Sequence, residues 1–321
     1  MMIYYIFLFM IGLLLVLKGG DVFVDSSITI SLRLKIPRMV VGGTIVSLAT
    51  TAPELVVSTT ASYMGDSGIA IGNAVGSAIA NIGLIVGISA ILAPLAIDVK
   101  DFRRRALWMI LSAVLVIIFS WDFEVNRTSG FILFSLGVCY LLFNSLRALF
   151  ERSKNEINSK ILLVPNYSIA KAAMMFLFGA ILVIIGSKFL VNSGIEIAKA
   201  LKIPSLIIGL TVVAVGTSLP ELVTAITSAK KNVADLSIGN IVGANILNLA
   251  FITGAAAIIR PLSIDHLTRY YAFTWLFIML TAMVIIFWWK GKMGKKSGII
   301  LLTLYILYNL GLVVAAIMQA Q

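Results

Sequence analysis

The sequence predicts an all-α integral membrane protein with ten transmembrane helices, arranged as two inverted five-helix repeats with broken helices at the midplane. Hydrophobic residues make up 60% of the 321 residues, charged residues only 12%, and the mean hydropathy is +1.05. A soluble domain carries about twice that share of charge. The chain also contains the same apolar segment twice, each time with a glutamate beside a proline. Internal duplication in a membrane protein is typical of transporters.

The two copies are related by a constant offset. Glu54 ends the motif in GGTIVSLATTAPELVVS and Glu221 ends it in GLTVVAVGTSLPELVTA, 167 positions later. The same offset relates GNAVGSAIAN to GNIVGANILN. Between 12–98 and 179–265 no gap is needed, and about 36 of the 87 paired positions are identical. A shared hydrophobic bias does not explain that level of identity, so we interpret it as an internal repeat.

Ten stretches are long and apolar enough to cross a bilayer, because a helical span needs about 20 such residues. They are 3–31, 39–63, 69–93, 106–121, 129–149, 169–199, 206–229, 236–259, 270–289 and 298–318. The alternating pattern of a transmembrane β-barrel does not occur. Five spans per copy is an odd number, so the copies are expected to insert in opposite orientations. The chain then divides into a first repeat at 1–149, a cytoplasmic linker at 150–168 and a second repeat at 169–321.

The basic residues predict the orientation. With the N-terminus outside, the inside loops hold 18 lysines and arginines and the outside loops hold 5. We therefore expect a multi-pass protein of the cell membrane with both termini outside. The net charge of +11 follows from this topology, so it does not indicate a nucleic-acid partner. The first span lacks the basic n-region of a cleaved signal peptide, and the single cysteine, Cys139, excludes an intramolecular disulfide.

Pro53 and Pro220 each interrupt a predicted span. A proline inside a helix removes a backbone hydrogen bond, which is expected to leave carbonyls near 47–49 and 214–216 without helical donors. An unsatisfied carbonyl in hydrocarbon costs several kcal/mol unless it lines a polar cavity or binds something, and a cation is a natural partner. Glu54 and Glu221 are also costly in a bilayer, which points to a functional role. The alternative is that both acids cap the helices that restart after the prolines.

Hydroxyl groups accompany both glutamates within about one helical turn. Thr50 and Thr51 precede Glu54, and Thr217 and Ser218 precede Glu221. Hydroxyl, carbonyl and carboxylate oxygens together form a site for a hard cation such as Ca²⁺.

The GN segments are expected to supply the facing wall of this site. Ser77 and Asn81 are one helical turn apart, so both can point at Glu54. In the second copy the counterparts are Ala244, which offers no side-chain oxygen, and Asn248. The glycines of these segments allow close helix packing, and their first asparagines either cap the helix or pin the break.

With these residues the chain resembles the cation/calcium exchanger superfamily, in particular the prokaryotic sodium/calcium exchangers. The paired signatures are TTAPE with GNAVGSAIAN and GTSLPE with GNIVGANILN, and the resemblance covers nearly the whole chain. It implies antiport of Ca²⁺ against Na⁺ by alternating access, with the first and sixth spans sliding over a fixed core. It implies a transporter rather than an enzyme, with transported ions in the site and no resident cofactor.

The resemblance also implies a set of ion ligands. The two calcium-binding carboxylates are Glu54 and Glu221, and the four hydroxyl or carbonyl ligands are Thr50, Thr51, Thr217 and Ser218. The backbone-carbonyl ligands of sodium are at Ser47 and Ala214. Ser77 is a further sodium ligand, and Asn81 and Asn248 are amides in the middle of the site. Two positions depart from the family pattern, because Asn248 stands where an aspartate is typical and Ala244 where a serine is typical. The site then holds two acids rather than three.

Other functions stay open at this stage. The closest alternative is exchange of Ca²⁺, or of another divalent cation, driven by H⁺ instead of Na⁺. A channel would also fit inverted repeats, although a deep site with two carboxylates holds ions more tightly than conduction favours. An intramembrane enzyme would need a nucleophile or base, and Cys139 and His266 are far from the repeat centres in sequence. The expected partners are therefore Ca²⁺, Na⁺ or H⁺, and the lipid bilayer.

Overall fold

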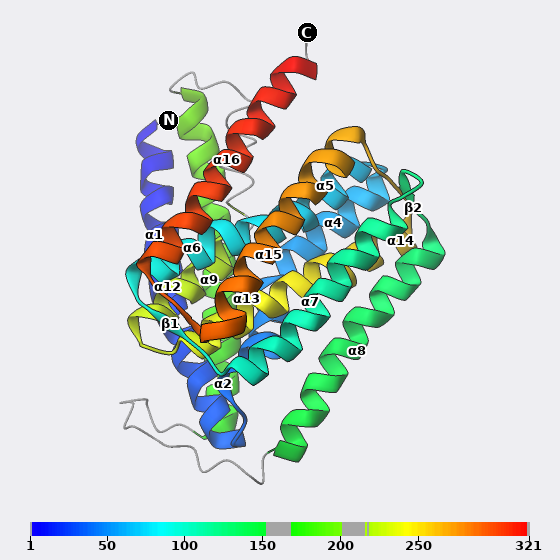
Figure 1. The fold of residues 1–321 in the computed structure, drawn as a ribbon. Helices are drawn as coiled ribbons and strands as arrows, with labels where there is room; N and C mark the ends of the chain where they lie inside the picture. The colour runs from blue at the N-terminus through cyan, green and yellow to red at the C-terminus, as the bar shows by residue number, and fades with distance from the viewer. Residues whose placement is uncertain (1, 152–167, 201–215, 217, 320–321) are drawn as a thin grey trace.

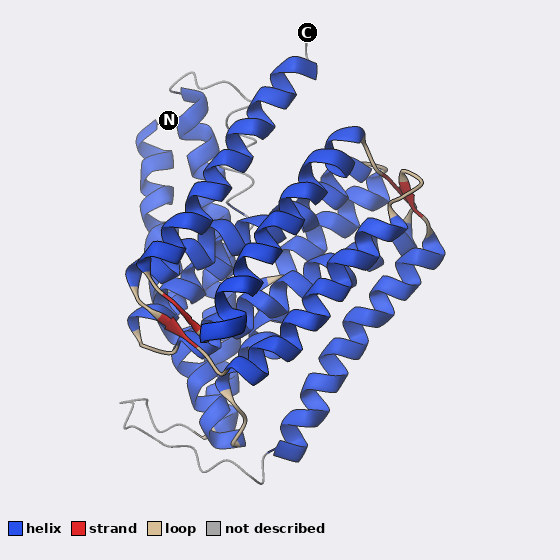
Figure 2. Cartoon of the chain, viewed as in Figure 1, coloured by secondary structure: helices blue, strands red, loops and turns tan. Residues whose placement is uncertain are grey.

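The computed structural model describes residues 2–151, 168–200, 216 and 218–319. In these ranges the chain is a bundle of helices with two very short strand pairs (Figures 1 and 2). Seven described helices are long and apolar enough to cross a membrane, and one bent helix pair raises the number to eight. The chain is thus an all-helical membrane protein, as the composition predicts.

The first half of the chain contains two helices with π-helical turns, in which one extra residue widens the helix. These turns, written η, join α2 to α3 and α5 to α6. In order, the elements are α1 (Met2–Leu34), α2 (Arg38–Val41), η1 (Gly42–Val46), α3 (Ser47–Thr50), α4 (Ala52–Met64), α5 (Ser67–Ala80), η2 (Asn81–Val86), α6 (Gly87–Leu92), β1 (Leu95–Ala96), α7 (Val99–Phe119), β2 (Glu124–Val125) and α8 (Arg127–Glu151).

The second half repeats this order in the residues that the structure describes, except that the π-helical η5 precedes α15 where α7 has no such turn. Its elements are α9 (Ile169–Ala200), α12 (Leu219–Lys230), α13 (Ala234–Ile246), η4 (Leu247–Ile252), α14 (Thr253–Ile259), β3 (Leu262–Ser263), η5 (Leu267–Ala272), α15 (Phe273–Lys290), β4 (Lys292–Met293) and α16 (Lys295–Gln319). Both α12 and α13 begin 167 residues after their counterparts α4 and α5. The duplication seen in the sequence is therefore repeated in the secondary structure.

The two longest helices, α1 and α9, pack against each other in opposite directions (Figure 1). A methyl group on Gly12 would lie 2.9 Å from the carbonyl oxygen of Gly186, and one on Gly19 would lie 3.1 Å from that of Gly179. The helices therefore touch backbone to backbone, which only glycine permits. Gly179 and Gly186 are the counterparts of Gly12 and Gly19 at the offset of 167, so repeat-equivalent residues meet across an antiparallel contact.

Two short antiparallel strand pairs connect the halves, a feature that the all-α prediction does not include (Figure 2). β1 pairs with β4 through Leu95 and Met293, and β2 pairs with β3 through Val125 and Leu262. Each pair joins a loop of the first half to a loop of the second half, so the ends of the bundle are tied across the repeat boundary.

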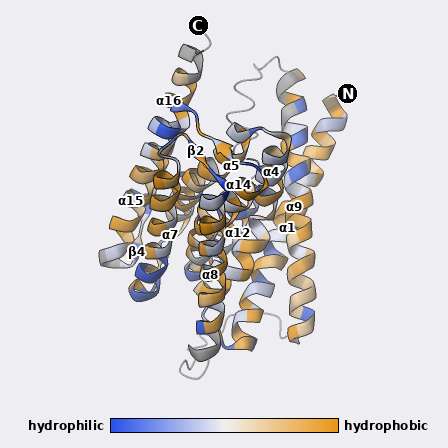
Figure 3. Cartoon of the chain, turned by 90° about the vertical axis from the view of Figure 1, so that its right-hand side faces the viewer, coloured by the Kyte–Doolittle hydropathy of each residue, from blue (hydrophilic) through white to orange (hydrophobic). Residues whose placement is uncertain are grey.

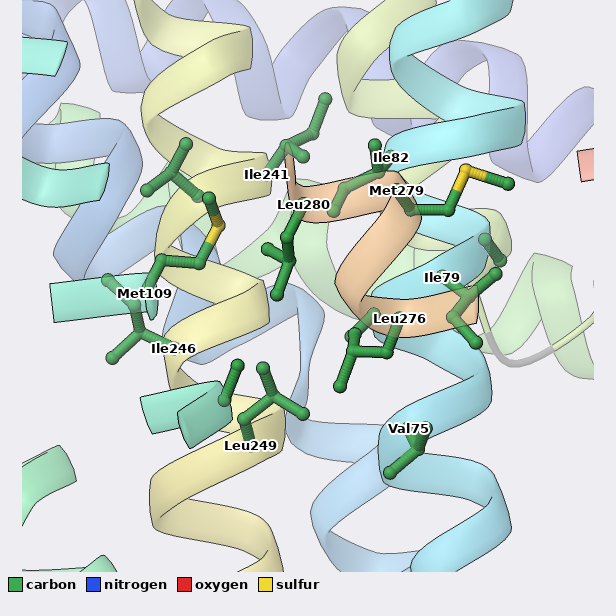
Figure 4. Packing of buried hydrophobic residues seen from close by; sticks show 14 of the residues in the cluster. Val75, Ile79, Ile82, Met109, Ile241, Ile246, Leu249, Leu276, Met279 and Leu280 are labelled. Carbon is green, nitrogen blue, oxygen red and sulfur yellow. The ribbon is translucent and has the colours of Figure 1, made fainter. Parts of the chain in front are cut away.

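The core lies between the helices that carry the repeated motifs. In Figure 4, Leu276 and Leu280 of α15 lie between side chains of α13 and side chains of α5. Ile79 of α5 and Ile241 of α13 are fully buried in this cluster. The central helices are therefore enclosed by protein, which is what a buried polar site in a membrane protein requires.

The outer helices are apolar on their exposed faces. Large hydrophobic side chains such as Ile3 and Phe7 of α1 and Met174 of α9 are exposed. Figure 3 shows apolar residues along α1, α9 and α15. Exposed apolar surface of this extent is expected where lipid surrounds the protein.

Ten spans stay a prediction, because two of them are not identified in the described residues by length and apolarity. The expected span 106–121 lies in α7, which begins at Val99 and carries five charged residues in its first seven positions. Much of the expected span 206–229 lies outside the described residues. The remaining eight coincide with the eight apolar helices or helix pairs.

Ion pairs connect elements at the end of the bundle where α1 finishes and α13 begins. Arg38 donates from Nε to Asp235 at 2.8 Å, which joins α2 to α13. Lys231 contacts Asp25 of α1 at 2.8 Å and Asp21 at 3.7 Å. All five side chains are partly exposed, so each pair contributes no more than about 1 kcal/mol to stability.

Candidate functional site

A helix break places Glu54 inside the bundle. The segment Arg38–Thr50 and helix α4 are bent by 46° at Thr51, and Pro53 lies at the first turn of α4. Proline suits that position because the first turn needs no backbone donor from it. Pro220 and Glu221 occupy the first turn of α12 in the same way. In both halves the proline therefore starts a new helix and the glutamate follows directly behind it.

Both glutamates are fully buried and unpaired. Glu54 and Glu221 each have 0% exposure, and none of their four carboxylate oxygens accepts a hydrogen bond in the described structure. The two carboxylates lie close enough to interact electrostatically. Two such groups without partners are strongly disfavoured in a membrane interior. Each carboxylate also lies near its own backbone N–H in the first turn of its helix, so the capping alternative stays open.

Two of the expected hydroxyl groups lie beside these carboxylates, and a third is buried next to the start of α12. The Ser77 hydroxyl lies beside the Glu54 carboxylate, and the Thr50 hydroxyl lies beside that of Glu221, both short of hydrogen-bond geometry. Ser218, which directly precedes α12, is 1% exposed, and its hydroxyl has no partner. Thr50 comes from the first half and Glu221 from the second, so the two motifs meet across the repeats.

The Ser47 carbonyl has hydrogen-bond donors within its own helix. The Ser47 carbonyl accepts the Thr51 N–H at 2.9 Å, the Thr51 hydroxyl at 2.7 Å and the Thr50 hydroxyl at 3.3 Å. The prediction that this carbonyl lacks donors is therefore wrong. Pro53 withholds only the donor that would reach Ala49, and threonine hydroxyls readily bond back to the preceding turn.

The asparagines of the GN segments form a buried amide cluster. Asn81 and Asn248 are fully buried, and the Oδ1 atom of each lacks a partner, as does Nδ2 of Asn248. Nδ2 of Asn81 donates to Oδ1 of Asn245 at 3.0 Å. Asn245 was not among the predicted residues, although it lies inside GNIVGANILN. Its repeat counterpart, Ala78, is apolar, so the duplication gave no signal for it.

The first asparagines of the GN segments pin the helix breaks. Asn73 donates from Nδ2 to the Glu54 carbonyl at 3.2 Å and to the Ser58 hydroxyl at 3.0 Å. The single proton of the Thr50 hydroxyl is shared between Oδ1 of Asn240 at 3.2 Å and the Ser47 carbonyl at 3.3 Å. The two asparagines do not cap their helices, because α5 and α13 begin several residues earlier, at Ser67 and Ala234.

The remaining predicted ligands, Thr217 and Ala214, lie outside the described residues. Ala244 is fully buried in α13 and contributes no side-chain oxygen. Among the described residues, no group of three or more histidine, cysteine or acidic side chains could hold a metal ion. In the part of the chain that the structure describes, Glu54 and Glu221 are the acidic side chains that are fully buried.

Several unpartnered oxygens remain at the predicted positions. Seven side-chain oxygens have no hydrogen-bond partner: both carboxylate oxygens of Glu54 and of Glu221, Oδ1 of Asn81, Oδ1 of Asn248 and Oγ of Ser218. Buried acceptors are normally satisfied, so such a group indicates a ligand. Oxygen ligands with two negative charges suit Ca²⁺ or Na⁺ and do not suit soft metals.

Comparisons with known proteins place the chain in a family. The family described as "Sodium/calcium exchanger protein" matches residues 4–146 and 171–314. The sodium/calcium exchanger MaX1 of Methanosarcina acetivorans is 30% identical over an alignment of 339 positions that includes gaps and covers 93% of this chain and 95% of that protein. The inner membrane protein YrbG of Escherichia coli is 31% identical over 299 residues, which cover 92% of each protein.

A solved structure shares the fold. The sodium-calcium exchanger NCX_Mj, soaked with 10 mM Na⁺ and 10 mM Sr²⁺, superposes with a TM-score of 0.83 at 32% identity, covering 96% of this chain and 98% of that one. With two matched segments, relatives over nearly its full length and a shared fold, the chain belongs to the sodium/calcium exchanger family of membrane transporters, which are not enzymes.

Proposed function

We propose that the chain is a secondary antiporter that exchanges Ca²⁺ for Na⁺ across the membrane by alternating access. The observation that supports this most is the pair of buried, unpaired carboxylates at two helix breaks. A divalent cation would supply the charge that Glu54 and Glu221 lack. Two Na⁺ ions would do the same, which allows the two ions to compete for one site.

The proposal includes a specific set of ligands. Glu54 and Glu221 would bind Ca²⁺ directly, assisted by oxygens of Thr50, Thr51, Thr217 and Ser218. Ser77, Asn81 and Asn248, with the backbone at Ser47 and Ala214, would complete the Na⁺ positions. The Thr50 hydroxyl beside the Glu221 carboxylate supports the Ca²⁺ part of this assignment, and the Ser77 hydroxyl beside the Glu54 carboxylate supports the Na⁺ part. The three bonds to the Ser47 carbonyl mean that it would have to exchange a hydroxyl for an ion.

The proposed architecture is two inverted five-span repeats with a cytoplasmic linker at 150–168 and both termini outside. The antiparallel contact between α1 and α9 supports the inversion, because the two helices are repeat counterparts. The distribution of basic residues supports the orientation. A protease that enters only from the cytoplasmic side should cut the linker, whereas cleavage from the outside would reverse the topology.

The decisive experiment is Ca²⁺ uptake into proteoliposomes that contain the purified protein. Vesicles loaded with Na⁺ and diluted into Na⁺-free buffer should accumulate Ca²⁺, and vesicles without a Na⁺ gradient should not. Uptake driven by a pH gradient and indifferent to Na⁺ would replace this proposal with H⁺-coupled exchange. A current carried by Ca²⁺ without any opposing ion would indicate a channel.

A further inference from the structure

Arg105 is a fully buried cation that is not part of the proposed ion site. It lies in the second turn of α7, has 0% exposure, and its Nε and Nη2 atoms have no hydrogen-bond partner. Its neighbours behave differently, because Arg103 donates to the Trp288 carbonyl at 2.8 Å and Arg104 pairs with Asp101. A buried guanidinium without an anion is costly, so its position calls for a specific role.

Arg105 is connected to the bent helix through one tyrosine. Nη1 of Arg105 donates to the hydroxyl oxygen of Tyr140 at 3.4 Å, and that hydroxyl donates to the Gly43 carbonyl at 2.7 Å. Tyr140 comes from α8 and has 0% exposure. The three residues therefore join α7, α8 and η1 in the protein interior. We refer to Arg105, Tyr140 and Gly43 as the arginine–tyrosine latch.

The latch acts on the segment that precedes Glu54. Gly43 lies in η1, and a methyl group on Gly243 of α13 would lie 2.7 Å from the Gly43 Cα and 2.7 Å from the Ser47 hydroxyl. This contact leaves no gap between η1 and α13. Any opening of a path between these two elements must pull Gly43 away from α13, and with it the carbonyl that Tyr140 holds.

The second repeat lacks the parts of this latch. Asp98 and Asp265 each accept the N–H of the residue three positions on, and the chain then continues as α7 in the first half and as the π-helical η5 in the second. Seven residues after these aspartates stand Arg105 and Ala272. The counterpart of Gly43 at the offset of 167 is Leu210. The latch is therefore specific to one end of the molecule, the end that the topology proposal assigns to the cytoplasm.

We propose that Arg105, acting through Tyr140, is a positioning residue that keeps η1 against α13 and so keeps the cytoplasmic half of the cation path closed. The proposal rests on the proposed function for the meaning of that path. Opening toward the cytoplasm then requires the latch to break. The closed state of the cytoplasmic side is therefore more stable than the closed state of the opposite side, where the equivalent positions lack the latch.

The test uses thiol accessibility, which needs no transport activity. In a Cys139→Ala background, Thr44→Cys places a small thiol on η1, where Thr44 is 6% exposed. Inverted vesicles are treated with a membrane-impermeant thiol reagent. Tyr140→Phe and Arg105→Gln should each raise the labelling rate about tenfold, because a hydrogen bond with a charged partner is lost. Arg105→Lys, which keeps the charge, should restore part of the protection.

A matched control removes another tyrosine hydroxyl. Tyr271 donates to the Tyr308 carbonyl at 2.6 Å, so Tyr271→Phe deletes the same kind of bond away from η1 and should leave labelling unchanged. Tyr140→Phe combined with Arg105→Gln should label no faster than the quicker single variant, because both act in one latch. Unchanged labelling in both single variants, or an equal rise with Tyr271→Phe, overturns the latch whether or not the protein exchanges Ca²⁺.

Discussion

Glu54 and Glu221 are the residues on which transport should depend most. Replacing either by glutamine keeps the size of the side chain and removes its charge. We expect Ca²⁺ transport to fall by at least about 100-fold in Glu54→Gln and in Glu221→Gln, because a divalent ion in a low-dielectric site needs anionic ligands. Initial rates of Ca²⁺ uptake would measure this. Near-normal exchange in both variants would mean that the two acids have only a structural role.

Asn248 is expected to limit the charge that the site can bind. Asn248→Asp, combined with Ala244→Ser, adds a third carboxylate and a hydroxyl at the two buried positions that depart from the family pattern. A third Na⁺ would then be compensated, so exchange should become sensitive to membrane potential. Asn309→Asp on α16 is the control, because it adds a carboxylate at a partly buried position whose partner is Tyr305, one turn earlier on the same helix. If potential affects the double variant no more than the wild type, Asn248 does not set the stoichiometry.

Among the secondary-structure elements, η1 and α13 pack with their backbones in direct contact. A methyl group on Gly243 would lie 2.7 Å from Gly43, closer than real packing allows. Gly243→Ala should therefore lower stability by about 1–3 kcal/mol, visible as a lower melting temperature in detergent. Gly294→Ala is the matched control, because a methyl group there would meet nothing within 4 Å. An unchanged melting temperature for Gly243→Ala would show that the two elements separate easily.

The breaks and the glutamates could be predicted from the sequence because their signals are local. A proline and a charge in an apolar segment stand out without any knowledge of tertiary contacts, and the repeat shows each of them twice. Asn245 and the arginine–tyrosine latch could not be predicted in the same way. Arg105 and Tyr140 are 35 residues apart and come from different helices, so only packing brings them together. The prediction for the Ser47 carbonyl was wrong because the helix continues to Thr51, whose N–H and hydroxyl both donate to that carbonyl.

At the scale of the whole molecule, two buried carboxylates predict electroneutral exchange. Two Na⁺ or one Ca²⁺ each balance them, whereas a third Na⁺ would leave a charge uncompensated in the membrane. Ca²⁺/Na⁺ exchange in vesicles, with the potential clamped by a potassium ionophore, should therefore proceed at the same rate at all potentials. A rate or final gradient that shifts strongly with voltage would reject the two-for-one ratio.

The strand pairs β1–β4 and β2–β3 have a consequence for how the protein is made. Leu95 meets Met293 and Val125 meets Leu262, so loops of the first half must wait for partners synthesised well over 100 residues later. Contacts this distant in sequence form slowly, because the intervening chain must first be placed. The first half will therefore leave the ribosome unfinished. The first half reaches its final structure only after the segments that contain β3 and β4 have been synthesised, so both halves complete their folding together.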